Sequence, residues 1–329
     1  MSIARIFSQL AVIAMLMIQC TSPANRVDLQ TLQYQIYPEV NSDKPELNSP
    51  FISTKGDEYV VAVTKEKSYA IIPVTLSNER GICGQLIMDT LDFPFYVKHG
   101  VHSKAELDEK TTITGWTLDT ITSLGRPEGL SNSGFMADDE DILSVISSDN
   151  EIVKKLDLTH PELARPLFHV LNMMDMDLSL DRWNMPKHRW DNITHFYYNG
   201  NEVHVEAYDT KGGQMSIFND GIQGAFHIKI WHEFAEDETN YLKDRYGHLT
   251  EKEIEDFMER LSYLNIGEMQ PQYIMRYGFY EGHTFWRACP VAISFIFGLK
   301  SLNELEEIFD GELYETISKH YSTQNQQFR

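Results

Sequence analysis

A hairpin signal at Asn199-Gly200 constrains the fold of this chain more than any other sequence feature. Two strand-like segments, 192–198 and 202–208, flank this dipeptide directly. Asn-Gly readily adopts the backbone of a two-residue turn between antiparallel strands. Residues 225–231 read as a third strand of the same kind. The sequence therefore predicts an antiparallel sheet in this part of the chain.

Strand signals and helix signals fall in separate blocks along the chain. Residues 59–63 and 69–75 are β-branched runs that predict another hairpin, and residues 82–88 predict a further strand. Capping boxes, in which a Ser or Thr precedes a Glu by three positions, predict three helix starts. They are Thr159 with Glu162, Thr250 with Glu253, and Ser301 with Glu304. Because strands and helices do not alternate as in βαβ units, we expect an α+β fold with an antiparallel sheet, hairpins and helices packed in blocks, in a single main domain.

Glycine-containing segments mark the expected breaks between these elements. Residues 211–213 (Lys-Gly-Gly) and 219–221 (Asn-Asp-Gly) predict turns between the second and third strands. The helix that starts at Ser301 is expected to continue towards Tyr321, with Gly311 as its weak point.

The N-terminus carries the signature of an export signal. Arg5 supplies a positive charge, and nine apolar residues follow at 10–18. This run is shorter than the ~20 residues that a membrane-spanning helix needs. Cys20 follows at once, and the pattern resembles the lipobox of bacterial lipoproteins, where the cysteine is acylated and becomes the first residue. Gln19 departs from the small residue usual before that cysteine, and cleavage after Ala24 is the alternative.

The resemblance covers only the first 20 residues, and it implies an exported protein held at the membrane by its N-terminal lipid. We expect a signal peptide at 1–19, a tether leading into the domain at 20–50, one α+β domain at 51–321, and a frayed tail at 322–329. The expected location is the bacterial cell envelope, in the periplasm or at the cell surface.

The charge balance excludes one class of partner. The chain has 49 Asp and Glu against 28 Lys and Arg, for a net charge of −21. Such a surface repels phosphate backbones, so nucleic acid is not an expected partner. After removal of the leader, Cys83 and Cys289 are the remaining cysteines, and they either pair or stay two separate buried thiols.

The predicted hairpin places several metal-ligating side chains on one face. Side chains alternate between faces along a strand, so a two-residue turn puts His195 on the same face as His204 and Glu206. Two imidazoles and a carboxylate can bind zinc or iron. His227 on the third strand joins them if that strand pairs alongside. The alternative is an ordinary solvated sheet face. No cofactor is predicted apart from a transition metal at these residues.

Residues 267–290 form the most site-like segment of the sequence. Its polar and aromatic residues include Arg276, Glu281, His283, Trp286 and Arg287. Ligand pockets combine aromatic walls with a few fixed polar groups. The arginines suit an anion, Trp286 offers a stacking face for a sugar, and Glu281 and His283 are candidates for catalytic proton transfer. The alternative is a structural network, with an arginine paired to Glu281 and the aromatic side chains in the core.

Three functions fit these observations. The first is an envelope protein that binds a small polar, anionic or saccharide ligand through the 276–287 region. The second is a hydrolase or lyase acting on an envelope or dietary polymer, with Glu281 or His283 as acid or base, or a metal on the His195 face. The third is a structural or assembly lipoprotein. The sequence does not distinguish between these three functions, and it does not give the oligomeric state.

Overall fold

The computed structural model describes residues 51–52, 58–64, 69–74, 97, 100–108, 115–178 and 193–320. The expected signal peptide, the lipidation site at Cys20, the tether, the strand at 82–88, Cys83 and the tail at 322–329 lie outside the described residues. Cys289 is buried and is a free thiol.

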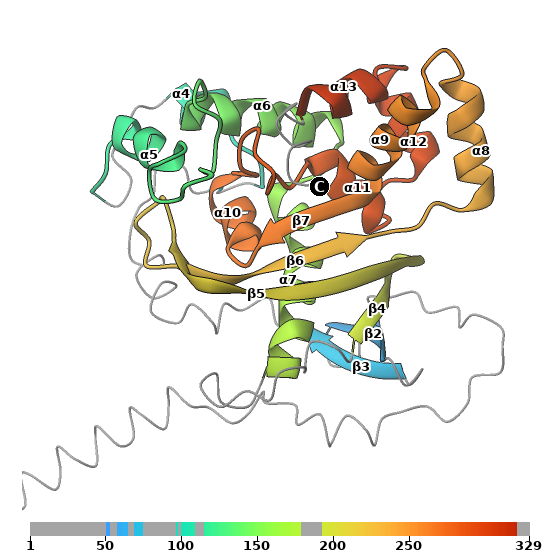
Figure 1. Cartoon of the computed structure of the whole chain (residues 1–329), viewed down its shortest axis with the longest axis horizontal. Coiled ribbons are helices and arrows are strands. Elements are labelled where there is room, and N and C mark those ends of the chain that lie inside the picture. The colour runs from blue at the N-terminus through green and yellow to red at the C-terminus, as the bar shows by residue number, and fades with distance from the viewer. Residues whose placement is uncertain are drawn as a thin grey trace, which may run out of the picture.

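The described strands form one antiparallel sheet. The strands are β1 Phe51–Ile52, β2 Glu58–Thr64, β3 Tyr69–Val74, β4 Ile193–Tyr198, β5 Asn201–Met215, β6 Gln223–Trp231 and β7 Tyr263–Gly267. Their order is β1-β2-β4-β5-β6-β7, and β3 also pairs with β2. In Figure 1 the long strands β5 and β6 lie between β4 and β7. The predicted hairpins at 59–75 and around Asn199-Gly200 are confirmed.

The turn at Asn199-Gly200 sets the register of the central strands. Both residues have positive φ angles, 47° and 87°, as a two-residue hairpin turn requires. His195 therefore lies opposite His204. The turn predicted at 211–213 is wrong, because β5 continues through it to Met215. The pairing with β6 shifts between Asp209 and Gln214, so an irregularity in the ladder absorbs the two glycines.

The helices pack above and across the sheet. They are α4 Lys104–Asp108, α5 Leu118–Gly125, α6 Ile142–Lys155, α7 His160–Leu178, α8 Glu236–Arg245, α9 Glu251–Ser262, α10 Gln270–Tyr277, α11 Pro290–Ile296, α12 Leu302–Phe309 and α13 Leu313–His320. All three predicted capping boxes form; Thr250 Oγ1, for example, accepts from the Glu253 N–H at 3.3 Å. α12 stops at Phe309 because Asp310 and Gly311 adopt left-handed backbone, with φ of 49° and 81°.

The core lies between one face of the sheet and the helices. Val203 and Ile230 belong to the same buried cluster as Leu167 of α7 and Ile293 of α11. In Figure 1, α7 crosses the strands, and α11 packs against α7, α9 and β7. A second buried cluster joins α5, α6 and α10 around Phe218. The described part of the chain is thus a single main α+β domain, as the blocks of strand and helix signals predicted.

No helix among the described residues is both long and apolar enough to span a membrane.

Candidate functional site

A pocket lies at the end of the sheet where β7 runs into α10. Its volume is about 290 Å³, near the lower end of the ~300–1,000 Å³ usual for small-ligand sites. The β5–β6 hairpin, the loop after α5 and the segment after α10 also contribute to its wall. The lining residues are Ser131, Ser133, Gly134, Phe135, Gly213, Gln214, Gly224, His227, Gly267, Glu268, Met269, Gln270, Glu281 and Trp286.

Glycines in the strands leave room for this pocket. A Cβ atom built on Gly267 would meet no atom within 4 Å, and one on Gly213 would meet its nearest neighbour at 3.8 Å. Gly224 differs, because a Cβ there would lie 3.1 Å from Cγ of Met269. The wall at Gly213 and Gly267 is therefore open backbone, whereas Gly224 is needed for close packing against the start of α10.

Glu281 supplies a buried carboxyl group to the pocket. Its side chain is only 5% exposed, and its φ of 63° is unusual for a residue with a side chain. Oε2 accepts a hydrogen bond from Oγ1 of Thr284 at 3.1 Å. Burial raises the pKa of Glu281 well above its ordinary value, while Thr284 and Arg287 oppose the shift. Burial therefore favours the neutral form of this carboxyl group, which can both donate and accept a hydrogen bond.

An aromatic pair and an amide complete the polar wall. The ring centroids of His227 and Trp286 lie 3.8 Å apart with 37° between their planes. Burial lowers the pKa of His227, which keeps the imidazole neutral. Nδ1 of His227 and Oε1 of Gln270 are buried and have no hydrogen-bond partner among the described residues. Two residues that line the pocket thus keep unused hydrogen-bonding capacity.

Arg287 is not part of the pocket lining. Its guanidinium group pairs with Asp149 of α6, Nη2 meeting Oδ1 and Nη1 lying 3.3 Å from Oδ2, and both side chains are buried. Nη1 also donates to the backbone carbonyl of Glu281. Burial raises the pKa of Asp149 to about 6 although Arg287 opposes the shift, so the pair is ionised at neutral pH. Arg287 therefore positions the backbone of Glu281 instead of facing a ligand.

His283 and Arg276 also lie outside the pocket lining. Nδ1 of His283 contacts Oε1 of Glu140, and its Nε2 donates to the carbonyl of Lys319 at 2.7 Å. Burial alone would raise the pKa of Glu140, but its hydrogen bonds, chiefly that from His283, lower it to about 2. The same hydrogen bond raises the pKa of His283. Arg276 is buried, and its Nη1 has no hydrogen-bond partner among the described residues.

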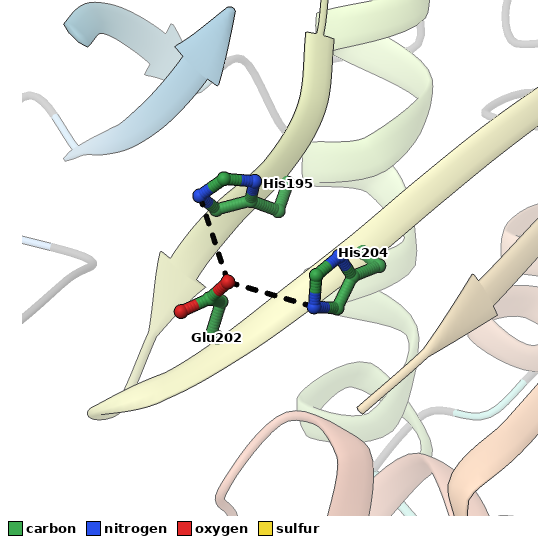
Figure 2. A group of neighbouring side chains, drawn as sticks. All are labelled: His195, Glu202 and His204. Atoms are coloured by element: carbon green, nitrogen blue, oxygen red, sulfur yellow. Dashed lines mark ion pairs between the residues drawn. The ribbon is translucent and has the colours of Figure 1, made fainter. Parts of the chain in front are cut away.

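The sheet face that was predicted to bind a metal ion carries Glu202, not Glu206, beside its two histidines. His195 of β4 and His204 of β5 point toward Glu202 of β5 (Figure 2), and the ligand atoms of these three residues lie within 4.8 Å of one another. Glu206 does not join them, because it is half-exposed and its Oε2 lies 4.0 Å from Nζ of Lys229. His227 packs against Trp286 instead.

Sequence reasoning therefore identified part of each site. It named Glu281 and Trp286 for the pocket and the two histidines for the sheet face, but it did not name Gln270 or Glu268. It placed Glu202 on the sheet face without choosing it as a ligand. Gln270 and Glu268 do fall within the segment 267–290 that was singled out, and Glu202 lies on the predicted face. Comparisons of the chain with protein-family models, with curated proteins and with solved structures found no match. The function is therefore argued from the geometry of the pocket and of the sheet face.

Proposed function

We propose that the protein binds a small neutral polar ligand of the saccharide class in the pocket at the end of β7. The observation that carries this proposal is the buried Glu281, held at a positive φ where it lines the pocket and where burial raises its pKa. Residues held in sparsely populated backbone conformations cluster at functional sites. A neutral carboxyl group suits a hydroxyl-bearing ligand, since it both donates and accepts.

The other lining residues favour the same ligand chemistry. Sugar rings offer apolar faces, against which Trp286 can stack, and hydroxyl groups, which match the amides of Gln214 and Gln270. The described lining residues include no Lys or Arg. A fully charged anion would find no cationic side chain among these lining residues, because Arg287 forms an ion pair with Asp149 outside the pocket. Of the polar, anionic and saccharide ligands expected from the sequence, the pocket lining therefore favours a neutral saccharide.

The proposed setting is the bacterial cell envelope. The apolar run at 10–18 and Cys20 support export and a lipid anchor, with the domain held at a membrane through residues 20–50. Replacing Cys20 with Ser is expected to release the processed protein from membrane fractions, and full retention of that variant would contradict the anchor. Binding and anchoring are separate claims, because the domain can be tested without residues 1–19.

Binding is tested by titrating the mature protein with a panel of neutral monosaccharides and disaccharides in a calorimeter. Trp286→Ala is expected to weaken binding at least ~10-fold, equivalent to about 1.4 kcal/mol, through loss of the stacking face. Tyr241→Ala is the matched control, because Tyr241 is an exposed aromatic side chain on α8. Equal affinities of the two variants, or no saccharide binding by the wild-type protein, would contradict the proposal and leave a structural role for the lipoprotein.

Hydrolysis of a glycosidic bond is a second candidate, favoured by one observation. A second acidic residue, Glu268, lines the same pocket as Glu281, whose pKa is raised by burial. Glycoside hydrolases use a protonated carboxyl group as general acid and a second carboxylate as base or nucleophile. If this candidate is correct, Glu281→Gln will abolish turnover of a chromogenic glycoside and retain binding of the intact sugar. Binding without any turnover by the wild-type protein would exclude it for that sugar.

A further inference from the structure

The sheet face away from the core carries a second group of ligating side chains. The register of β4, β5 and β6 places His195 opposite His204, and His204 opposite Trp231. Glu202 lies two residues from His204 on β5, so its carboxylate reaches both imidazoles (Figure 2). All three side chains are partly buried, with exposed fractions of 19%, 33% and 19% for His195, Glu202 and His204.

The two distances from Glu202 to the histidines are close to those between the ligand atoms of a metal site. Oε1 of Glu202 lies 3.6 Å from Nε2 of His195 and 3.5 Å from Nε2 of His204. In a tetrahedral site with bonds of about 2.1 Å, ligand atoms lie about 3.4 Å apart. The ligand atoms of the two histidines are also within 4.8 Å of each other.

Neighbouring side chains hold the three residues in this arrangement. The His204 ring stacks on Trp231, with centroids 5.2 Å apart and 12° between the planes. The His195 ring meets the ring of Tyr197 edge to face at 5.9 Å. The Tyr197 hydroxyl donates to Oε2 of Glu202 at 3.4 Å, which leaves Oε1 directed at the imidazoles. Outer hydrogen bonds of this kind orient the ligands of metal sites.

From this geometry we infer that His195, Glu202 and His204 bind one divalent transition metal ion, with Zn²⁺ the best match. Two imidazoles and one carboxylate are a common protein ligand set for zinc, and three protein ligands leave a fourth position for water. The partial exposure of all three side chains gives that position access to solvent. The site is independent of the proposed ligand pocket, whose described lining shares none of these residues.

The test uses the mature chain without any histidine tag, stripped with chelator and titrated with ZnCl₂ against a chromophoric competitor. One equivalent is expected to bind in the micromolar range or tighter. His204→Gln and Glu202→Gln should each weaken binding at least ~100-fold, since each removes a ligand, whereas Tyr197→Phe should weaken it about 10-fold. Titration with CoCl₂ should give the visible absorption of tetrahedral Co²⁺ in the wild-type protein.

The matched controls are Glu206→Gln and His227→Gln, which change the same residue types on the same sheet without touching the cluster. Both should bind Zn²⁺ as the wild-type protein does. Circular dichroism of every variant shows whether it is folded, and the Co²⁺ spectrum reports on the site in the folded wild-type chain. Absence of one-equivalent binding, or equal affinities in ligand and control variants, would overturn the inference.

Discussion

Two groups of residues within 276–287 have opposite surroundings, although nothing in the sequence separates them. Glu281 and Trp286 line the pocket. Arg287 and His283 are engaged by Asp149 and Glu140, which lie 138 and 143 positions away along the chain. A dense run of polar residues is therefore not by itself a site. What matters is which of its members the rest of the fold leaves facing a cavity.

The largest expected effect on stability comes from substituting Arg287, which is paired with Asp149. Arg287→Met removes the partner of Asp149, which is completely buried, and should lower the free energy of unfolding by about 3–5 kcal/mol. Urea denaturation at pH 7 measures this loss. The double variant Arg287→Met/Asp149→Leu should recover much of it, because no buried charge is left unpaired. A loss below about 1 kcal/mol in the single variant would show that the pair is not a structural element.

A substitution at Glu281, which lines the pocket, should instead stabilise the fold. Burial raises the pKa of Glu281, so the folded protein holds a proton that the unfolded chain releases above about pH 4.5. Stability contributed by this group therefore falls as pH rises from about 4.5 toward the raised pKa. Glu281→Gln removes this penalty, and at pH 7 it should stabilise the fold by about 1 kcal/mol. Saccharide binding should be retained, because the amide also donates and accepts hydrogen bonds.

The control for this variant is Glu251→Gln, which alters an exposed acid on α9. It should change neither stability nor binding. Denaturation from pH 4 to pH 8 gives the required curves. If Glu281→Gln destabilises the protein at pH 7, the carboxyl group is a structural acceptor, and the contrast between the two groups fails.

A smaller, pH-limited effect is expected at His283. The pKa of Glu140 is lowered to about 2 and the pKa of His283 is raised, each through the other. The acid contributes stability above about pH 4.5, and this is lost as pH falls toward 2. The histidine contributes below about pH 6.5, and this is lost as pH rises through its raised pKa.

His283→Gln should therefore cost about 1 kcal/mol between pH 4.5 and 6.5 and less at pH 9, after allowance for the partial exposure of the pair. Thermal unfolding of both proteins across this range measures the difference. A cost that does not depend on pH would mean that His283 acts by packing alone. Saccharide affinity should stay unchanged at neutral pH, since His283 does not line the pocket.

Local signals in the sequence were sufficient for the two predicted hairpins and for three helix starts. The turn at Asn199-Gly200 and the capping box at Thr250 act over three or four residues, so the chain displays them directly. The extension of β5 through Gly212-Gly213 depends instead on pairing with β6, and the glycines alone suggested a turn. Tertiary contacts overrode the local preference there.

The candidate sites were predictable only in part, for a related reason. Strand parity places His195, His204, Glu202 and Glu206 on one face, but it does not decide which carboxylate reaches both imidazoles. That choice depends on side-chain direction, and Lys229 of the next strand engages Glu206. The pocket wall at Gly267 likewise becomes visible only when β7, β6 and the loop after α5 are brought together.

Saccharide binding in the pocket is tested most directly by a substitution that fills the pocket without disturbing the fold. Gly267→Leu adds a side chain where a Cβ atom would meet nothing within 4 Å, and Gly247→Leu makes the same change in an exposed turn, where the nearest atom would lie 3.4 Å away. Calorimetric titration compares both variants with the tightest-binding neutral saccharide of the panel. We expect a wild-type affinity for Gly247→Leu and at least a ~100-fold loss, about 2.7 kcal/mol, for a Gly267→Leu protein with an unchanged melting temperature. Equal affinities in the two folded variants would show that the saccharide binds elsewhere and would rule out this pocket as its site.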